Sequence, residues 1–87
     1  MVFWCLTRYY IEWDCFDHHA YSLHFKTKEE GLEMFNDYMN TEIEAYELKS
    51  DKYRYVEQDD HLEFEMDLAF KFSYMVLEKI NLVRRMC

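Results

Sequence analysis

The chain has 87 residues, with 18 acidic and 10 basic side chains and a formal net charge of −8. This length predicts a single domain (1–87), and a content of 51% hydrophobic and 20% aromatic residues excludes a disordered chain. The negative charge argues against direct binding to nucleic acid or to an anionic membrane, and no stretch approaches the roughly 20 apolar residues that cross a bilayer.

Several chemical signatures are missing from the sequence. It has no proline and a single glycine, Gly31, so it contains no glycine-rich phosphate loop, dinucleotide fingerprint or nucleophile elbow. We therefore predict no enzymatic activity and no cofactor. Cys5, Cys15 and Cys87 are an odd number without framework spacing, and the first residues lack the pattern of a signal peptide. Both features favour the cytoplasm, although a Cys5–Cys15 disulfide remains an alternative.

The first 26 residues are typical of a β-hairpin. Residues 2–13 predict a strand in which Phe3, Tyr9 and Ile11 share one face with Cys5 and Trp13. Residues 14–17 carry two aspartates suited to a turn, and residues 19–26 alternate again as a half-buried return strand.

A short amphipathic helix is expected over residues 27–40. Thr27 and Glu30 form a capping-box pattern, and Leu32, Phe35 and Met39 recur at helical spacing. Asn40 is a plausible left-handed stop. After it, runs at 43–48 and 53–56 favour a second hairpin with its tip at residues 50–51. The alternative extends the helix through Tyr46, because no helix breaker intervenes.

The segment from residue 61 onward fits two periodicities. Leu62, Phe64 and Met66 alternate as in a strand, whereas Leu62, Met66, Ser73, Leu77 and Ile80 fit a helical stripe. Acidic residues at its start and basic residues at its end suit a helix dipole, so we predict a long C-terminal helix, with a strand at 62–67 as the alternative. The expected fold is α+β: an N-terminal β-hairpin, a short amphipathic helix, one or two further strands, and a long C-terminal helix packed on the sheet.

The negative charge is concentrated in the middle of the chain, where residues 29–67 hold fourteen acidic and three basic side chains. Rows of carboxylates at helix or strand spacing can imitate the phosphates of a nucleic acid and attract a basic groove. We therefore expect a non-enzymatic inhibitor whose partner is a basic host protein that handles nucleic acid. The expected contacts are seven acids and three aromatic anchors: Glu42, Glu44, Glu47, Asp51, Glu57, Asp59, Asp60, Tyr46, Tyr53 and Tyr55.

In size, acidity and layout the chain resembles the small inhibitors that phages and mobile elements deploy against CRISPR and restriction nucleases. The resemblance concerns general character and no motif, so it assigns no residues. Two other functions remain open. One is a self-associating adaptor, such as a homodimer, that uses Val2, Trp4, Leu6 and the last helix. The other is a small metalloprotein whose ligands come from Cys15, His18 or His19, and His24.

Overall fold

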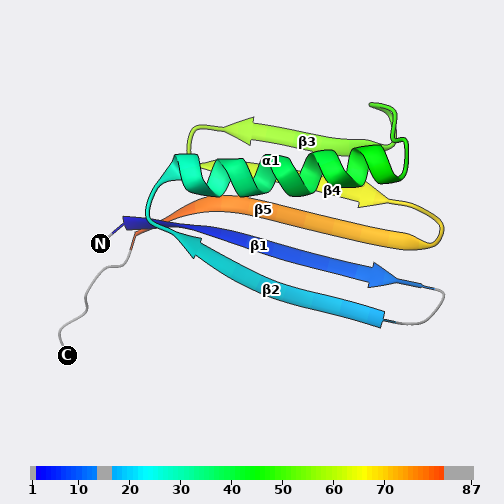
Figure 1. Ribbon diagram of the computed structural model, residues 1–87, viewed down its shortest axis with the longest axis horizontal. Helices are drawn as coiled ribbons and strands as arrows, with labels where there is room; N and C mark the ends of the chain where they lie inside the picture. The colour runs from blue at the N-terminus through cyan, green and yellow to red at the C-terminus, as the bar shows by residue number, and fades with distance from the viewer. Residues whose placement is uncertain (1, 14–16, 82–87) are drawn as a thin grey trace.

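A single antiparallel sheet forms the body of the molecule, and a helix crosses one of its faces (Figure 1). The computed structural model describes residues 2–13 and 17–81. In these ranges five strands stand in the order β2-β1-β5-β4-β3. The elements in chain order are β1 (Val2–Glu12), β2 (Asp17–Phe25), α1 (Lys28–Ala45), β3 (Tyr53–Gln58), β4 (His61–Asp67) and β5 (Lys71–Asn81).

The first and last strands lie side by side in the sheet. β1 pairs with β2 as a hairpin, α1 carries the chain across the sheet, and β3, β4 and β5 follow as an antiparallel meander. β5 then closes the sheet against β1 along its whole length, from Val2 opposite Asn81 to Glu12 opposite Lys71. The two predicted strands of the N-terminal hairpin are confirmed, although the second begins at Asp17, which was predicted to lie in the turn. Residues 14–16 of that predicted turn lie outside the described residues.

The predicted long C-terminal helix is wrong. Residues 61–67 and 71–81 form β4 and β5, so the alternative strand at 62–67 is correct. The connection between them is a tight turn at Ala69 and Phe70, closed by reciprocal backbone bonds between Leu68 and Lys71. This turn contains no glycine, asparagine or aspartate, the residues by which a turn is recognised in a sequence. β5 also has neighbours on both edges, so Met75, Val76 and Leu77 are all buried and the alternation that would mark a strand is interrupted.

The first helix begins as predicted but ends later. The Thr27 hydroxyl accepts a hydrogen bond from the Glu30 backbone N–H, which confirms the N-cap. Asn40 lies inside α1, so the predicted stop is wrong and the alternative extension is correct: the helix ends at Ala45 with Tyr46 as its C-cap. The predicted strand at 43–48 is therefore wrong as well. Residues 53–56 do form a strand, but β3 pairs with β4.

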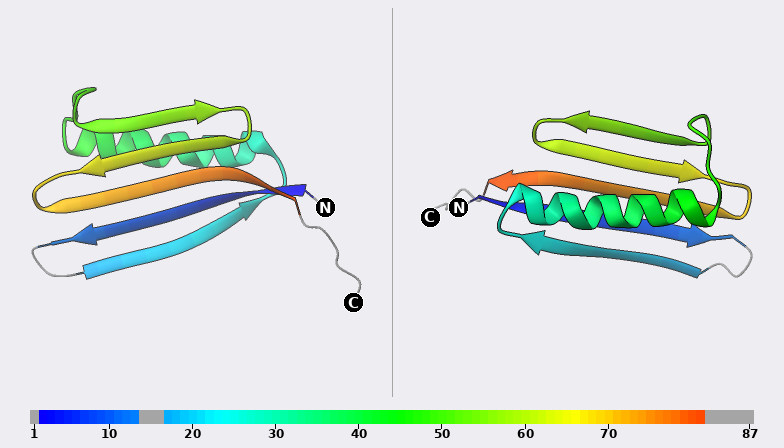
Figure 2. Two further views of the ribbon diagram at one scale, coloured as in Figure 1. Left: turned by 180° about the vertical axis from the view of Figure 1, so that it is seen from behind. Right: turned by 45° about the horizontal axis from the view of Figure 1, so that its top comes forward.

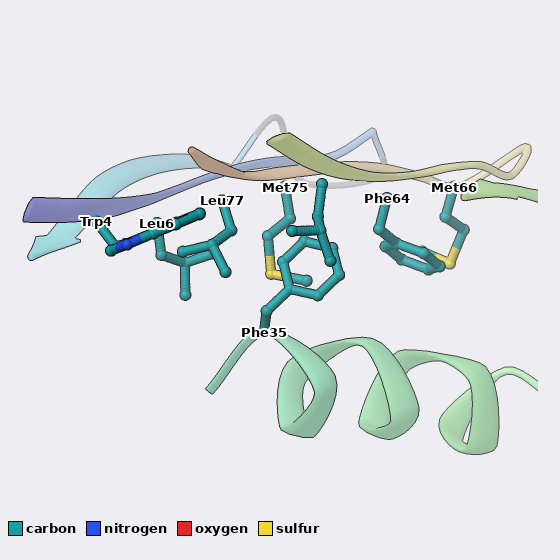
Figure 3. Packing of buried hydrophobic residues seen from close by; sticks show 8 residues of the cluster. Trp4, Leu6, Phe35, Phe64, Met66, Met75 and Leu77 are labelled. Atoms are coloured by element: carbon teal, nitrogen blue, oxygen red, sulfur yellow. The ribbon is translucent and has the colours of Figure 1, made fainter. Parts of the chain in front are cut away.

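The hydrophobic core fills the space between α1 and the sheet. Phe35 projects from the helix among side chains that point from the sheet toward it (Figure 3), namely Trp4, Leu6, Leu62, Phe64, Met66, Met75 and Leu77. Trp4 and Leu6 are buried here, so they cannot form the predicted self-association surface with a last helix that does not exist. The helix approaches β5 closely at Gly31, where an added Cβ would lie 2.8 Å from a Leu77 methyl carbon. In the described part of the chain, no helix has the length and apolar character needed to cross a membrane.

Candidate functional site: the outward face of the helix

The predicted contact residue Glu42 does not lie on the surface. It is 5% exposed, under the C-terminal half of α1, and its Oε1 accepts a 2.7 Å hydrogen bond from Arg8 Nη2. Lys71 Nζ lies 3.4 Å from both carboxylate oxygens, and the Ser73 hydroxyl lies 3.5 Å from Oε1. Because two cations of the sheet compensate its charge inside the protein, Glu42 is unavailable to a partner, and its assignment as a contact is wrong.

Tyrosines surround this buried ionic cluster of Glu42, Arg8 and Lys71. Tyr21 accepts a hydrogen bond from Arg8 and Tyr46 one from Lys71, and the Tyr38 ring lies 4.5 Å from the Arg8 guanidinium carbon. Burial by itself lowers the pKa of Lys71, but its hydrogen bond with Tyr46 and the charge of Glu42 outweigh burial, so the pKa is raised overall. The cluster is thus a charged but compensated part of the core.

The other six predicted acidic contacts are exposed but fall into two groups. Glu44, Glu47 and Asp51 lie at or beyond the C-terminal end of α1, where β3 begins. Glu57, Asp59 and Asp60 lie at the far end of β3, and Lys28 at the start of α1 donates a hydrogen bond to the Asp59 carbonyl. Six residues of strand, about 20 Å, separate the two groups, so they do not form one compact cluster.

The three predicted aromatic anchors are mainly packing residues. Tyr46 contacts Lys71 and the Phe70 ring, and Tyr53 packs on Phe64 with ring centroids 5.6 Å apart. Of the three, only Tyr55 is classed as exposed, at 38%, although its ring lies 6.2 Å from Phe35. A partner could reach the edge of Tyr55, whereas Tyr46 and Tyr53 are half-buried.

A continuous row of carboxylates lies instead along the outward face of α1, and we call it the acidic helix face. Because the helix continues to Ala45, its solvent-facing side gathers five acidic side chains and no basic one: Glu29, Glu30, Glu33, Asp37 and Glu44. Glu29, Glu33 and Asp37 follow one another at four-residue steps, which places neighbours about 5–6 Å apart. The row extends about 22 Å along the helix axis.

The acidic helix face has no ion pairs within the described ranges, 2–13 and 17–81. A shallow groove runs beside it toward β2, lined by Phe25, Glu30, Glu33, Met34, Asn36, Asp37 and Asn40. These five acids belong to the negative segment 29–67, but only Glu44 among them was predicted to be a contact. The predicted helix over 27–40 already places Glu29, Glu33 and Asp37 on one face, and only the position of Glu44 on that face depends on the true end of the helix at Ala45.

Two acids on β4, Glu63 and Glu65, differ from those on α1 because they form ion pairs within the chain. Arg54 bonds both Glu63 and Glu65, at 3.0 and 3.3 Å. The hydrogen bond between His61 and Glu63, at 2.7 Å, is the main reason that the pKa of Glu63 is lowered, assisted by Tyr74 and Arg54. These carboxylates on the uncovered face of the sheet are therefore poorer partner contacts than the helical row.

The described residues do not assemble the alternative metal site. Cys15 lies outside them, and the residues that are described contain no group of three or more His, Cys, Asp or Glu side chains able to hold a metal ion. His18 and His24 lie on one face of β2 but six residues, about 20 Å, apart. His19 points to the other face, where it stacks on Tyr10 and bonds Asp17.

The described cysteine, Cys5, is a half-buried free thiol on the uncovered face, 3.7 Å from the Thr7 hydroxyl.

Comparison of the chain with protein-family models, with characterised proteins and with solved structures finds no match.

Proposed function

We propose that this protein is a non-enzymatic inhibitor that binds a basic, nucleic-acid-handling protein in the cytoplasm and occludes its DNA or RNA site. The acidic helix face is the docking surface. The observation that carries the proposal is the charge of this surface. The outward side of α1 holds five carboxylates and no basic side chain, and none of the five forms an ion pair in the described chain.

The acidic helix face is unfavourable for the helix that carries it. Like charges four residues apart, such as Glu29–Glu33 and Glu33–Asp37, each destabilise a helix by about 0.2–0.5 kcal/mol. Glu44 adds a negative charge in the last turn of α1, where the helix dipole favours cations. That last turn contains no basic residue that would offset it. The helix dipole favours Glu29 and Glu30 in the first turn, but stability does not explain Glu33, Asp37 and Glu44, whereas attraction to a basic groove does.

The spacing also suits the proposed target. A groove that binds nucleic acid presents lysine and arginine side chains placed to neutralise successive phosphates. Carboxylates at steps of about 5–6 Å on a preformed helix can engage such side chains without paying an ordering cost. Most of this attraction acts through the electrostatic field, so association should be fast and should weaken as salt is added.

The test compares two triple charge reversals of equal net charge. One replaces Glu33, Asp37 and Glu44 with lysine on the acidic helix face, and the control replaces Glu57, Asp59 and Asp60 with lysine at the β3–β4 turn. The probe is a panel of purified RNA-guided and restriction nucleases, each holding fluorescent DNA. The readout is displacement of the DNA, followed by fluorescence anisotropy at about 50 and 300 mM salt.

We expect the unaltered protein to displace DNA from at least one member of the panel, more weakly at the higher salt. The helix variant should lose at least about 100-fold in potency, while the turn variant stays within about threefold. The helix substitutions turn the Glu29–Glu33 repulsion into an attraction and put a cation in the last turn, while positions 33 and 37 stay like-charged, so the variant should be about as thermally stable as the parent protein. Thermal melting of the variant checks that unfolding is not the cause of its lost potency. Displacement that survives the helix substitutions, or no displacement across the panel, would contradict the proposal.

A further inference from the structure

No described element covers the sheet face opposite α1, and this face carries a band of apolar side chains. The helix crosses only one face, as both views in Figure 2 show. On the other face, alternate residues of the adjacent strands β1 and β5 point outward, among them Phe3, Tyr9, Ile11, Phe72, Tyr74 and Ile80. All six are half-buried with no layer above them, and Tyr9 and Phe72 pack edge to face with ring centroids 6.2 Å apart. We call this surface the open face.

The two flanks of the open face carry different charges. On the β4 side, Glu63, Glu65 and Asp67 point outward in the same rows as Val76, Tyr74 and Phe72. On the β2 side, the outward residues are His18, Ala20, Ser22 and His24, with Lys26 just beyond the strand. Arg54 of β3 pairs with Glu63 and Glu65, so of these three acids only Asp67 has no ion pair among the described residues. An apolar centre thus separates a margin that ends in Asp67 from a margin of histidine, small residues and lysine.

We propose that the open face is the interface of a homodimer, in which two copies pack sheet against sheet. The two-fold axis runs parallel to the strands, between β1 and β5. This symmetry places β1 of one copy over β5 of the other, so that Ile11 meets Phe72, Tyr9 meets Tyr74 and Phe3 meets Ile80. It also places the β2 margin of each copy over the β4 margin of the other, with His18 opposite Asp67.

Charge complementarity selects this arrangement over the other face-to-face dimer. A two-fold axis perpendicular to the strands, through the middle of the band at the row of Thr7, Val76 and Glu63, would stack each strand on its own copy and place Glu63 over Glu63 of the partner subunit. Like charges brought together at an interface are costly, which disfavours that packing. In the proposed dimer the acids instead face histidine, alanine and serine.

The area is sufficient for a specific dimer. Four strands at a spacing of about 4.8 Å, over the roughly 27 Å from residue 3 to residue 11, give a flat area of about 500 Å² per copy. Side chains that protrude from the sheet add to the surface that the dimer buries. The total of about 1,000 Å² reaches the lower bound for a biological interface. The dimer has four layers with a helix on each outside, so it would present two acidic helix faces on opposite sides. The dimer itself does not depend on the proposed inhibitory function.

The experiment measures the molar mass by light scattering and sedimentation at about 1 to 100 µM protein. We expect a dimer, and Ile11→Asp at one end of the open face or Ile80→Asp at the other should each raise the dissociation constant at least about 30-fold. Val2→Asp is the control, since Val2 is exposed on the helix side of β1 and should leave the dimer intact. Circular dichroism and thermal melting confirm that each variant is folded.

A charge exchange tests the arrangement. His18→Glu places a carboxylate opposite Asp67 of the partner subunit and should weaken the dimer severalfold, whereas H18E combined with D67K should restore it to within about twofold. Positions 18 and 67 of one chain lie three strand spacings apart, about 14 Å, so compensation within a subunit is screened. A monomer at 100 µM, a dimer unaffected by both aspartate substitutions, or no restoration by the exchange would each overturn the proposal. A dimer that is unaffected by both aspartate substitutions would indicate pairing through the free edge of β2.

Discussion

Glu42 and Glu44 lie two residues apart on the same helix, yet their carboxylates occupy opposite environments. Glu42 faces the sheet and meets Arg8 and Lys71, whereas Glu44 is exposed on the acidic helix face. A two-residue step turns a helix through about 200°, which carries a side chain from one side to the other. Identical side chains therefore have different roles, one in the core and one at the surface.

Replacing these two glutamates with glutamine should give very different stabilities. Glu42→Gln leaves the Arg8 and Lys71 charges partly buried without a counter-ion, so we expect a loss of about 3 kcal/mol in the free energy of unfolding. Glu44→Gln should change it by less than about 0.5 kcal/mol. Urea unfolding of both variants measures the difference, and equal effects would show that the cluster contributes little.

The pH dependence of stability should show how much the protonated Lys71 side chain stabilises the folded protein. Its pKa is raised in the folded protein, because the hydrogen bond with Tyr46 and the charge of Glu42 outweigh burial. A raised folded pKa adds stability that is fully present below the unfolded pKa of about 10.4 and is lost as the pH rises through the folded pKa. We expect stability to fall steeply above about pH 10.

Lys71→Met tests this assignment. The variant should be less stable at neutral pH, because Glu42 then has only Arg8 as a counter-ion, and its stability should decline less between about pH 9 and 12. A decline as steep as that of the parent protein would assign the alkaline loss to tyrosines, since the pKa values of Tyr38, Tyr55 and Tyr74 are also raised.

At the scale of single elements, the C-terminal end of α1 contains a Schellman motif built without glycine. Leu48 N–H donates to the Ile43 carbonyl at 2.9 Å and Glu47 N–H to the Glu44 carbonyl at 3.3 Å. Glu47 sits at the position after the cap with a φ of 50°, the left-handed region that favours glycine. Without a glycine there, the sequence gives no sign of where the helix ends.

Glu47→Gly should therefore stabilise the protein. Glycine relieves the left-handed strain of a side-chain-bearing residue, and we expect the free energy of unfolding to rise by about 1 kcal/mol. Glu44→Gly is the matched control, three residues earlier and within the helix, and should lower it by about as much. Thermal melting compares the two, and a loss of stability in Glu47→Gly would mean that the side chain makes a stabilising interaction of its own.

At the scale of the whole molecule, the charges are sorted by position. Glu42 under the helix is neutralised by Arg8 and Lys71, and Glu63 and Glu65 on β4 pair with Arg54, whereas the acidic helix face forms no ion pair in the described chain. The acids without an ion pair among the described residues therefore lie mainly on the acidic helix face and near the two ends of β3, where they include Glu47, Asp51, Asp59 and Asp60. The covered side of the sheet holds the core, and its open face holds the apolar band.

This sorting predicts that salt stabilises the protein. Screening of the acidic helix face should raise the free energy of unfolding by about 0.5–1 kcal/mol between about 20 and 500 mM NaCl, at one protein concentration. The double variant Glu33→Lys, Glu44→Lys should be more stable at low salt and less sensitive to salt. If instead salt lowers the stability, surface ion pairs such as Arg54–Glu63 contribute more than the repulsion does.

Local patterns were sufficient for the elements with local signals. Alternation over residues 2–13 and 19–26 identified the first hairpin, and the Thr27–Glu30 pattern identified the start of α1. Those signals act between residues close in the chain, through side-chain periodicity and capping, so they survive whatever the rest of the fold does.

Only the tertiary structure decided the rest. The segment 71–81 is a strand because β1 and β4 flank it on both edges, partners that lie up to about 80 residues away in sequence and that no local periodicity can represent. Long-range packing likewise placed Glu42 against Arg8 and Lys71 in the core and left Glu29, Glu33 and Asp37 outside. The composition shows that the protein is acidic. Which carboxylates are exposed to solvent depends on where the helix ends and on which of its faces packs on the sheet.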